Sequence, residues 1–432
     1  MKKNNNIDVL LLFLAALCLP QTATAGELKS VTFCKDIAPI LFQRCASCHR
    51  PGEVAPFSLL SYRDAAKRSA YIADLTSSRQ MPPWKADHGA GQFADERRLT
   101  GEEIALIRRW AETGAIEGNP ADLPPAPKFT EGWQLGEPDM ILKMPEPYTL
   151  AASGPDEYRC FVLPFQLPAG RYIKSIEYRP GNRKIVHHAV LSALPHAQAM
   201  ARLAEGDGKS FLSGLAPPGR ILSGPLSIWT PGMDPHLLPD DLAAPWPEKT
   251  DLVLQLHLHP SGKPETEQSV LGIYLTDRKP RARLQLSAFS NDQINIPPGA
   301  SNYEVRTSRT LDADSTLFGV FPHMHLIGKT VHAVATLPDA SKIPLISISD
   351  WDFNWQYYYR YTAPLKLPAG TRIDVRWTYD NSDANPANPN KPARRVTFGE
   401  QTADEMAFLI FDTIMTGPPK DRPGRKLKAN AR

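Results

Sequence analysis

The chain is poor in cysteine, which restricts the metal chemistry it can carry. Only five of its 432 residues are cysteine, and none follows Cys160. A blue-copper site or a thiolate-bridged electron-transfer centre therefore cannot form beyond that residue, and a structural zinc site is disfavoured there. Cys34 and Cys160 could pair in an oxidising compartment, but two buried, unpaired thiols are the favoured interpretation.

The sequence also lacks a strong charge excess and a long apolar run. Its formal net charge is +3 with 22% charged residues, so no surface suited to nucleic acid is predicted. Two lysines precede an apolar run from Val9 to Leu19, which is too short to span a bilayer. With the small residues Ala23-Thr-Ala25, this pattern is typical of a signal peptide over residues 1–25. We expect a periplasmic or secreted protein that is not an integral membrane protein.

Proline, by contrast, is abundant, with 42 residues, as expected of short strands joined by rigid turns. Residues 26–118 have helical character, with a capping box at Thr100 and Glu103. Residues 119–129 form a proline-rich linker, and the apolar alternation beyond it predicts strands. We therefore expect a small all-α domain, then two all-β sandwiches at residues 130–282 and 283–416, and a solvated basic tail at residues 417–432.

The strongest short motif lies in the helical region. Cys45-Ala-Ser-Cys48-His49 has the C-x-x-C-H spacing of covalent c-type haem attachment. Cys45 and Cys48 would form the thioether bonds and His49 would be the proximal iron ligand, so a cytochrome c-like domain is expected. Met81, beside a stiff Pro-Pro turn, is the favoured sixth ligand and would raise the reduction potential. His88 is the alternative.

Further histidines gather in three short motifs of the predicted strands, His187-His188, His257-Leu-His259 and His323-Met-His325. Strand residues two apart project from one face, so each of the last two pairs could bind one metal ion. Consecutive residues project to opposite faces, so His187 and His188 could share a metal only at a strand end or a bulge. Imidazole and thioether ligands without thiolate favour copper with open positions, as oxygen activation requires.

With these motifs, residues 130–416 resemble the type II copper, ascorbate-dependent monooxygenases, the family of the peptidylglycine and dopamine hydroxylases. The residues similar to the family's first copper ligands are His187, His188 and His257 in Leu254-Gln-Leu-His257. Those similar to its second copper ligands are His323 and His325 in Phe321-Pro-His-Met-His-Leu-Ile-Gly, and Met406 in Asp404-Glu-Met. The resemblance implies two copper ions in two jelly-roll-like sandwiches, facing a cleft between them. The first copper would relay electrons, and the second would bind dioxygen and hydroxylate a C–H bond.

The resemblance also distinguishes these residues from their neighbours. His259 matches a family position that is not a ligand, so we expect it to support the site or lie at the surface. Met324 should point to the face opposite His323 and His325 and take part in packing. Without the resemblance, Met406 would be interpreted as an ordinary core residue.

Two departures from the family pattern bear on function. Peptide-amidating members hold their substrate with an Arg, an Asn and a Tyr, where this chain has Phe321, Phe408 and Ile410. Without the guanidinium that binds a carboxylate, we expect a neutral or apolar small organic substrate instead of a peptide C-terminus. The second departure is the haem motif. We hypothesise that the haem takes electrons from a periplasmic donor and passes them to the copper of His187, His188 and His257.

Two other functions remain open. The same scaffold could serve a non-catalytic periplasmic electron-transfer or copper-binding protein. Alternatively, the aromatic residues of Trp351–Tyr359 could bind a carbohydrate or a protein partner, although their alternation is equally that of strand core residues with cross-strand pairs.

Overall fold

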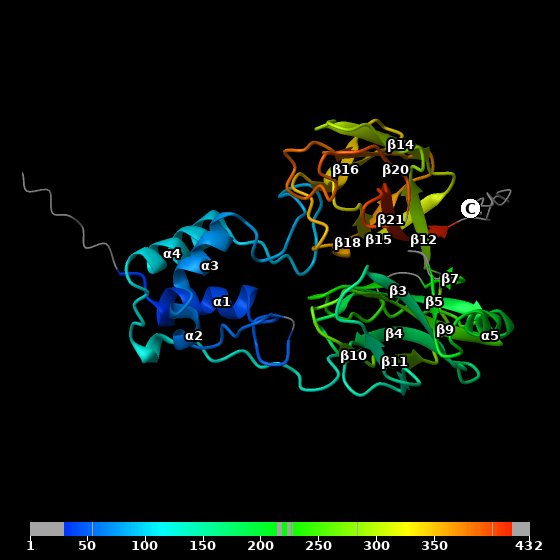
Figure 1. The fold of residues 1–432 in the computed structure, drawn as a ribbon, viewed down its shortest axis with the longest axis horizontal. Helices are drawn as coiled ribbons and strands as arrows, with labels where there is room; N and C mark the ends of the chain where they lie inside the picture. Colours follow the sequence, from blue (N-terminus) through cyan, green and yellow to red (C-terminus); the bar gives the residue numbers. More distant parts are fainter. Residues whose placement is uncertain are drawn as a thin grey trace, which may run out of the picture.

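The computed structural model describes residues 30–416, apart from residues 54, 214–217, 223–225, 227, 283 and 400. The predicted signal peptide and the predicted basic tail lie outside these described residues. The described chain forms a helical unit and two β-sandwiches (Figure 1). None of its helices combines the length and the apolar composition that crossing a membrane requires.

The helical unit occupies the N-terminal part of the described chain. Its elements are η1 (Phe33–Ile37), α1 (Ala38–Arg44), α2 (Tyr62–Ala66), α3 (Ser69–Ser77), α4 (Gly101–Glu112) and η2 (Pro120–Asp122). The predicted capping box is confirmed, because the Thr100 side chain accepts from the Glu103 amide and Glu103 accepts from the Thr100 amide. Trp110, which is fully buried, packs against Phe33 and fixes α4 to η1.

The first sandwich follows the proline-rich segment. Its strands are β1 (Met140–Lys143), β2 (Tyr148–Leu150), β3 (Glu157–Leu163), β4 (Tyr172–Arg179), β5 (Val186–Pro195), β6 (Phe211–Leu212), β7 (Arg220–Ile221), β8 (Ile228–Trp229), β9 (Thr250–Leu258), β10 (Glu265–Glu267) and β11 (Val270–Thr276). One sheet has the order β6-β3-β9-β5-β7, with β8 also paired to β5, and a second has the order β1-β11-β4. The leucines of β9 at positions 252, 254 and 256 lie in the core together with residues of β11.

The expectation of an all-β sandwich is wrong in one respect, because this unit contains the helix α5 (His196–Glu205). Helix α5 covers the face of β3 and β9 opposite the core, where Cys160, Val162 and Val253 are buried against Ala199. Strand β9 is therefore buried along its whole length, and its sequence is apolar on both faces near its start.

The described residues of the second sandwich form strands and loops without a helix. The strands are β12 (Gln285–Ser290), β13 (Asn295–Ile296), β14 (Tyr303–Thr310), β15 (Asp314–His323), β16 (Gly328–Thr336), β17 (Lys342–Ile348), β18 (Tyr359–Leu367), β19 (Arg372–Tyr379), β20 (Val396–Thr397) and β21 (Phe408–Thr416). The sheets have the orders β12-β21-β15-β18 and β14-β19-β16-β17. Their facing side chains, among them Val320, Phe411, Val375 and Trp377, form one buried core.

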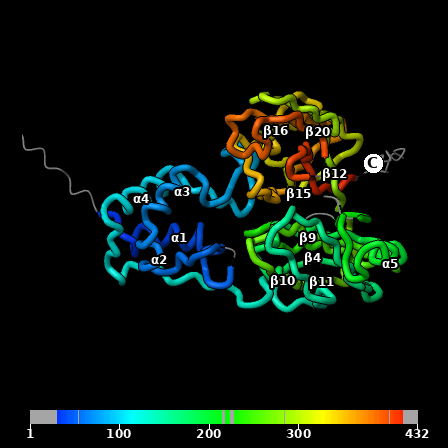
Figure 2. Tube along the Cα trace, in the orientation of Figure 1, coloured from blue at the N-terminus to red at the C-terminus, as the bar shows by residue number. Residues whose placement is uncertain are grey.

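The clamp segment, residues 84–98 between α3 and α4, attaches the helical unit to the second sandwich. Phe93 forms a β-bridge with Tyr361, and the rings of Trp84 and Phe93 lie in the core of the second sandwich. Lys85 also pairs with Asp350 at 2.9 Å. The helical unit therefore contacts the sandwich that comes last in the sequence, as Figure 2 shows for the blue segment beside β16.

The two described cysteines outside the C-x-x-C-H motif, Cys34 and Cys160, are unpaired. Cys34 is buried in the helical core, whereas Cys160 is buried under α5. The interpretation of both as buried thiols is confirmed.

We predict that Phe93→Ala loosens the clamp segment. The substitution removes a buried ring that packs on Tyr359 and Tyr361, and a buried Phe→Ala change costs about 3–5 kcal/mol. Limited proteolysis in increasing urea should cleave the clamp segment at a lower urea concentration than in the wild type. Tyr71→Ala, at a position on α3 with 55% exposure, is the control and should behave as the wild type. Unchanged cleavage of Phe93→Ala would show that the ring does not hold the segment.

Candidate metal centres

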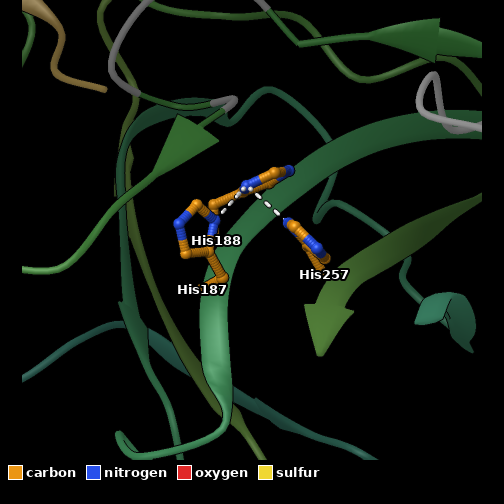
Figure 3. Close-up of side chains that lie close together, drawn as sticks. All are labelled: His187, His188 and His257. Atoms are coloured by element: carbon orange, nitrogen blue, oxygen red, sulfur yellow. Dashed lines mark hydrogen bonds between the residues drawn. The ribbon is translucent and has the colours of Figure 1, made fainter. Parts of the chain in front are cut away.

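The first histidine cluster forms where β5 begins. In the register of β5 and β9, His188 lies opposite His257 and Val186 lies opposite Leu258, so His187 is the extra residue of a bulge. The bulge turns His187 to the same side as His188. For these two consecutive residues to share one metal ion, the sequence pattern required a strand end or a bulge. The rings of His187, His188 and His257 consequently face one another (Figure 3).

The spacing of the ring nitrogens fits a single metal ion. The Nδ1 atom of His188 lies 3.2 Å from Nδ1 of His187 and 3.3 Å from Nδ1 of His257. Nitrogens bound at about 2.0–2.1 Å to one tetrahedral ion lie roughly 3.3–3.4 Å apart. Burial also lowers the pKa of His187 to about 4, with His257 as the next cause. The ring is therefore neutral at ordinary pH, as a metal ligand must be.

A carboxylate behind the first cluster orients His257. The Nε2–H of His257 donates to Asp156 at 2.7 Å, so its Nδ1 atom carries a lone pair directed towards the other two rings. The ring of His257 also stacks on Tyr158, with centroids 4.3 Å apart. His259 contacts the other oxygen of Asp156 at 2.7 Å and is 67% exposed, so it supports the site from the surface, as expected.

The second histidine cluster lies at the end of β15. The ring centroids of His323 and His325 are 5.1 Å apart. His323 donates from Nδ1 to Gln356 Oε1 at 2.5 Å, and His325 donates from Nδ1 to the carbonyl of Asp404 at 3.1 Å. Both Nε2 atoms are then acceptors, yet both are buried with no partner among the described residues. A buried nitrogen lone pair without a donor is costly, and a metal ion would satisfy both.

Electrostatics keeps this second pair neutral as well. Burial lowers the pKa of His323 to about 3, with His325 as the next cause, and lowers that of His325 to about 4. Met324, between them, is fully buried in the sandwich core, so its predicted packing role is confirmed.

Met406 is brought next to His325 by a shared acid. Strand β21 pairs with β15 so that Phe408, two residues after Met406, lies opposite His323, two residues before His325. The buried Glu405 carboxylate accepts from the amides of both His325, at 2.9 Å, and Met406, at 3.1 Å. The Met406 side chain is 4% exposed. The Met406 backbone therefore lies beside that of His325 and its side chain is buried, while its role as a ligand stays a prediction.

One aromatic ring lies between the two clusters. The ring of Phe353 stacks on His187, with centroids 5.5 Å apart, and meets His325 edge-on at 6.1 Å. The residues around Phe353 form a loop that ends where β18 begins at Tyr359. Of the stretch Trp351–Tyr359, interpreted as a strand from its alternation, only Tyr359 lies in one. Trp351 and Tyr359 are 8% and 1% exposed, which leaves little of either ring for stacking a carbohydrate.

The C-x-x-C-H motif is a tight turn after α1. The amides of Cys48 and His49 both donate to the carbonyl of Cys45, so the three side chains project from one side of a helical turn. His49 donates from Nδ1 to the carbonyl of Phe57 at 3.2 Å, which leaves Nε2 for an iron ion. Neither sulfur is in a disulfide. These features fit a covalent haem.

Both candidates for the sixth haem ligand line one cavity. It has a volume of about 740 Å³ and is lined by Arg44, directly before Cys45, and by Met81 and His88. Met81 is half-buried in the turn that follows α3, and its amide donates to the carbonyl of Leu75, whereas His88 is exposed. The choice of Met81 stays a prediction.

Four residues of these centres were not found by sequence reasoning: Asp156, Phe353, Gln356 and Glu405. Asp156, Phe353 and Gln356 lie in loops outside the strands. Glu405 stands beside a proposed ligand, but only the folded structure shows its carboxylate holding the His325 backbone. Burial raises the pKa of Glu405 to about 8, although the His325 amide opposes this.

Comparisons with known proteins add no functional assignment. No family model and no curated protein matches the chain. Among solved structures, the major capsid protein P2 of bacteriophage PM2 is 10% identical, over 64% of this chain and 97% of that one, with a TM-score of 0.24. PNGF-II is 11% identical, over 64% and 65%, with a TM-score of 0.26. Likenesses this weak carry no argument, so the function must be argued from the site.

We predict that Asp156→Ala weakens copper binding at the first cluster. Loss of the carboxylate frees the His257 ring to rotate and to change its tautomer, and loss of such a partner typically costs about 10–100-fold in metal affinity. Competition titration with a cuprous chelator measures the affinity. His259→Ala removes the exposed partner of the same carboxylate and should bind copper almost as the wild type. Equal affinities in Asp156→Ala and the wild type would contradict the orienting role.

Proposed function

We propose that this chain is an exported, haem- and copper-dependent monooxygenase that uses dioxygen to hydroxylate a C–H bond of a neutral or apolar organic molecule. The observation that carries the proposal is the pair of buried Nε2 atoms of His323 and His325, which have no hydrogen-bond partner in the described part of the chain. The Nδ1 atoms of the same two rings donate to Gln356 and to the Asp404 carbonyl. The backbone amides of Met406 and His325 both donate to the carboxylate of Glu405. The ligand types and their arrangement suit copper.

Copper in these centres would supply one-electron redox chemistry and dioxygen activation, and a haem c on Cys45, Cys48 and His49 would supply a one-electron store. The chain itself holds the imidazoles. Asp156, Gln356 and the Asp404 carbonyl each accept a hydrogen bond from one ring, which fixes its tautomer. Burial of His257 and His325, each 1% exposed, excludes water from the ligand nitrogens.

Side chains around the second cluster support an apolar substrate. The ring of Phe408 lies 6.4 Å from that of His323 and 6.3 Å from that of Phe398. Phe321 and Ile410, at the other positions where peptide-amidating relatives carry polar groups, are paired across β15 and β21. An aromatic and aliphatic wall offers dispersion contacts and no partner for a carboxylate.

The burial of both clusters also favours a second candidate, a non-catalytic periplasmic electron-transfer or copper-binding protein. His323 is 8% exposed, which restricts the approach of a bulky substrate. The two candidates differ in one result, since only the enzyme forms an oxygenated product.

We predict that the purified mature chain contains one haem c and two copper ions. His188→Ala and His325→Ala should each lose one copper, because each removes one of the few ligands of its centre. Elemental analysis with haem quantification tests this. With ascorbate as reductant and a panel of neutral aromatic and alkyl compounds, the wild type should incorporate isotopically labelled dioxygen and His325→Ala should not. Full metal loading without incorporation would favour the non-catalytic candidate.

We further predict that Met406→Leu removes a sulfur ligand from the second copper. X-ray absorption of the cuprous protein should show sulfur scattering in the wild type and none in the variant, because leucine keeps the volume but has no thioether. Met324→Leu is the matched control, since Met324 lies between the same two histidines and packs in the core. Sulfur scattering that persists in Met406→Leu would exclude Met406 as a ligand.

A further inference from the structure

One aromatic ring is shared by the two histidine clusters. Phe353 stacks on His187 of the first cluster, with 18° between the ring planes, and meets His325 of the second cluster at 79°. A ring that contacts one histidine of each cluster lies in the space between them. At this point the two clusters are therefore separated by a single side chain.

The loop is anchored to the second cluster on both sides of this ring. Before Phe353, the Trp351 side chain donates from Nε1 to the His325 carbonyl at 3.1 Å. After it, Gln356 accepts from His323 Nδ1 at 2.5 Å and donates from Nε2 to the Phe353 carbonyl at 3.1 Å. Trp351 and Gln356 are 8% and 6% exposed, and breaking buried hydrogen bonds is costly. The backbone that carries the ring is therefore fixed relative to the second cluster.

Phe353 also lies close to solvent. Its side chain is partly buried, and the next residue of the same turn, Asn354, is exposed. Solvent therefore reaches the turn that carries the ring.

Any room next to the two histidines would take up water. The Nε2 atoms of His187 and His325 are buried, and neither has a hydrogen-bond partner among the described residues. Polar atoms of this kind bind water where there is space for it, and one water molecule occupies about 30 Å³, which is less than the volume of a phenyl ring. Removing the Phe353 ring would thus provide both the room and the partners that a water molecule needs.

We propose that Phe353 is a wall shared by the two copper centres, whose apolar ring excludes water from the space between His187 and His325. The inference rests on the proposed function, because it gives the ring a role at two copper centres. It also departs from the family resemblance, which implies centres that face a cleft. Excluding water strengthens the electrostatic interactions within a site and prevents side reactions such as proton leakage.

The test measures water close to each cupric ion in the full chain. Electron spin echo envelope modulation of frozen samples in heavy water detects exchangeable deuterons near the ion. His188→Ala and His323→Ala each empty one centre and keep the two rings that Phe353 contacts, so the remaining centre is measured alone. In both backgrounds, adding Phe353→Ala should increase the deuteron modulation by the contribution of at least one water molecule.

Two further variants separate the exclusion of water from a general disturbance of the loop. Phe353→Leu keeps most of the apolar volume, so its deuteron modulation should stay near that of the unchanged position 353. Asn354→Ala alters the exposed neighbour in the same turn and should have no effect. An equal increase in all three variants would contradict the proposal, because it would not depend on the ring.

Two other results overturn the inference. Unchanged modulation at both centres in Phe353→Ala would show that the ring excludes no water. An increase at one centre alone would show that the wall is not shared. A chain that binds no copper would instead refute the proposed function, and this inference with it.

Discussion

The position of the proton on three buried histidine rings decides what this chain can bind. In His257 the proton is on Nε2, held by Asp156, and in His323 and His325 it is on Nδ1, held by Gln356 and a backbone carbonyl. The opposite nitrogen of each ring then carries a lone pair, which points into the protein interior. Burial makes the protonated forms of His323 and His325 unfavourable, and among the described residues their Nε2 lone pairs have no partner, so a metal ion is the natural partner.

The strand geometry that brings these rings together was largely predictable from the sequence. The spacing of His323 and His325 places both on one face of any strand, and the consecutive pair His187-His188 required the bulge that β5 contains. The capping box at Thr100 was equally local. These predictions succeed because they depend on the side-chain period of a strand and on residues that are neighbours along the chain.

What the sequence did not reveal depends on contacts between distant segments. Asp156 lies 101 positions from His257 and Gln356 lies 33 positions from His323, and no pattern in either loop marks it as a partner. Helix α5 was missed because it is short and lies within a run of predicted strands, and only the folded structure shows that it covers the outer face of β9. The attachment of residues 84–98 to the second sandwich is likewise a tertiary contact. It could not be predicted from the order of the chain, in which the first sandwich follows the helical unit.

That attachment gives the loop before β18 its significance. A loop of the second sandwich can lie near the Cys45–His49 turn only if the helical unit lies against that sandwich, and the clamp segment holds it there through Trp84 and Phe93. The loop then has different residues for different neighbours: Tyr357 faces Arg97, Gln356 binds His323, and Phe353 lies between His187 and His325. A regular strand would send alternate side chains to opposite faces. The irregular backbone of this loop instead allows one short stretch of chain to contact Arg97, His323 and the rings of His187 and His325.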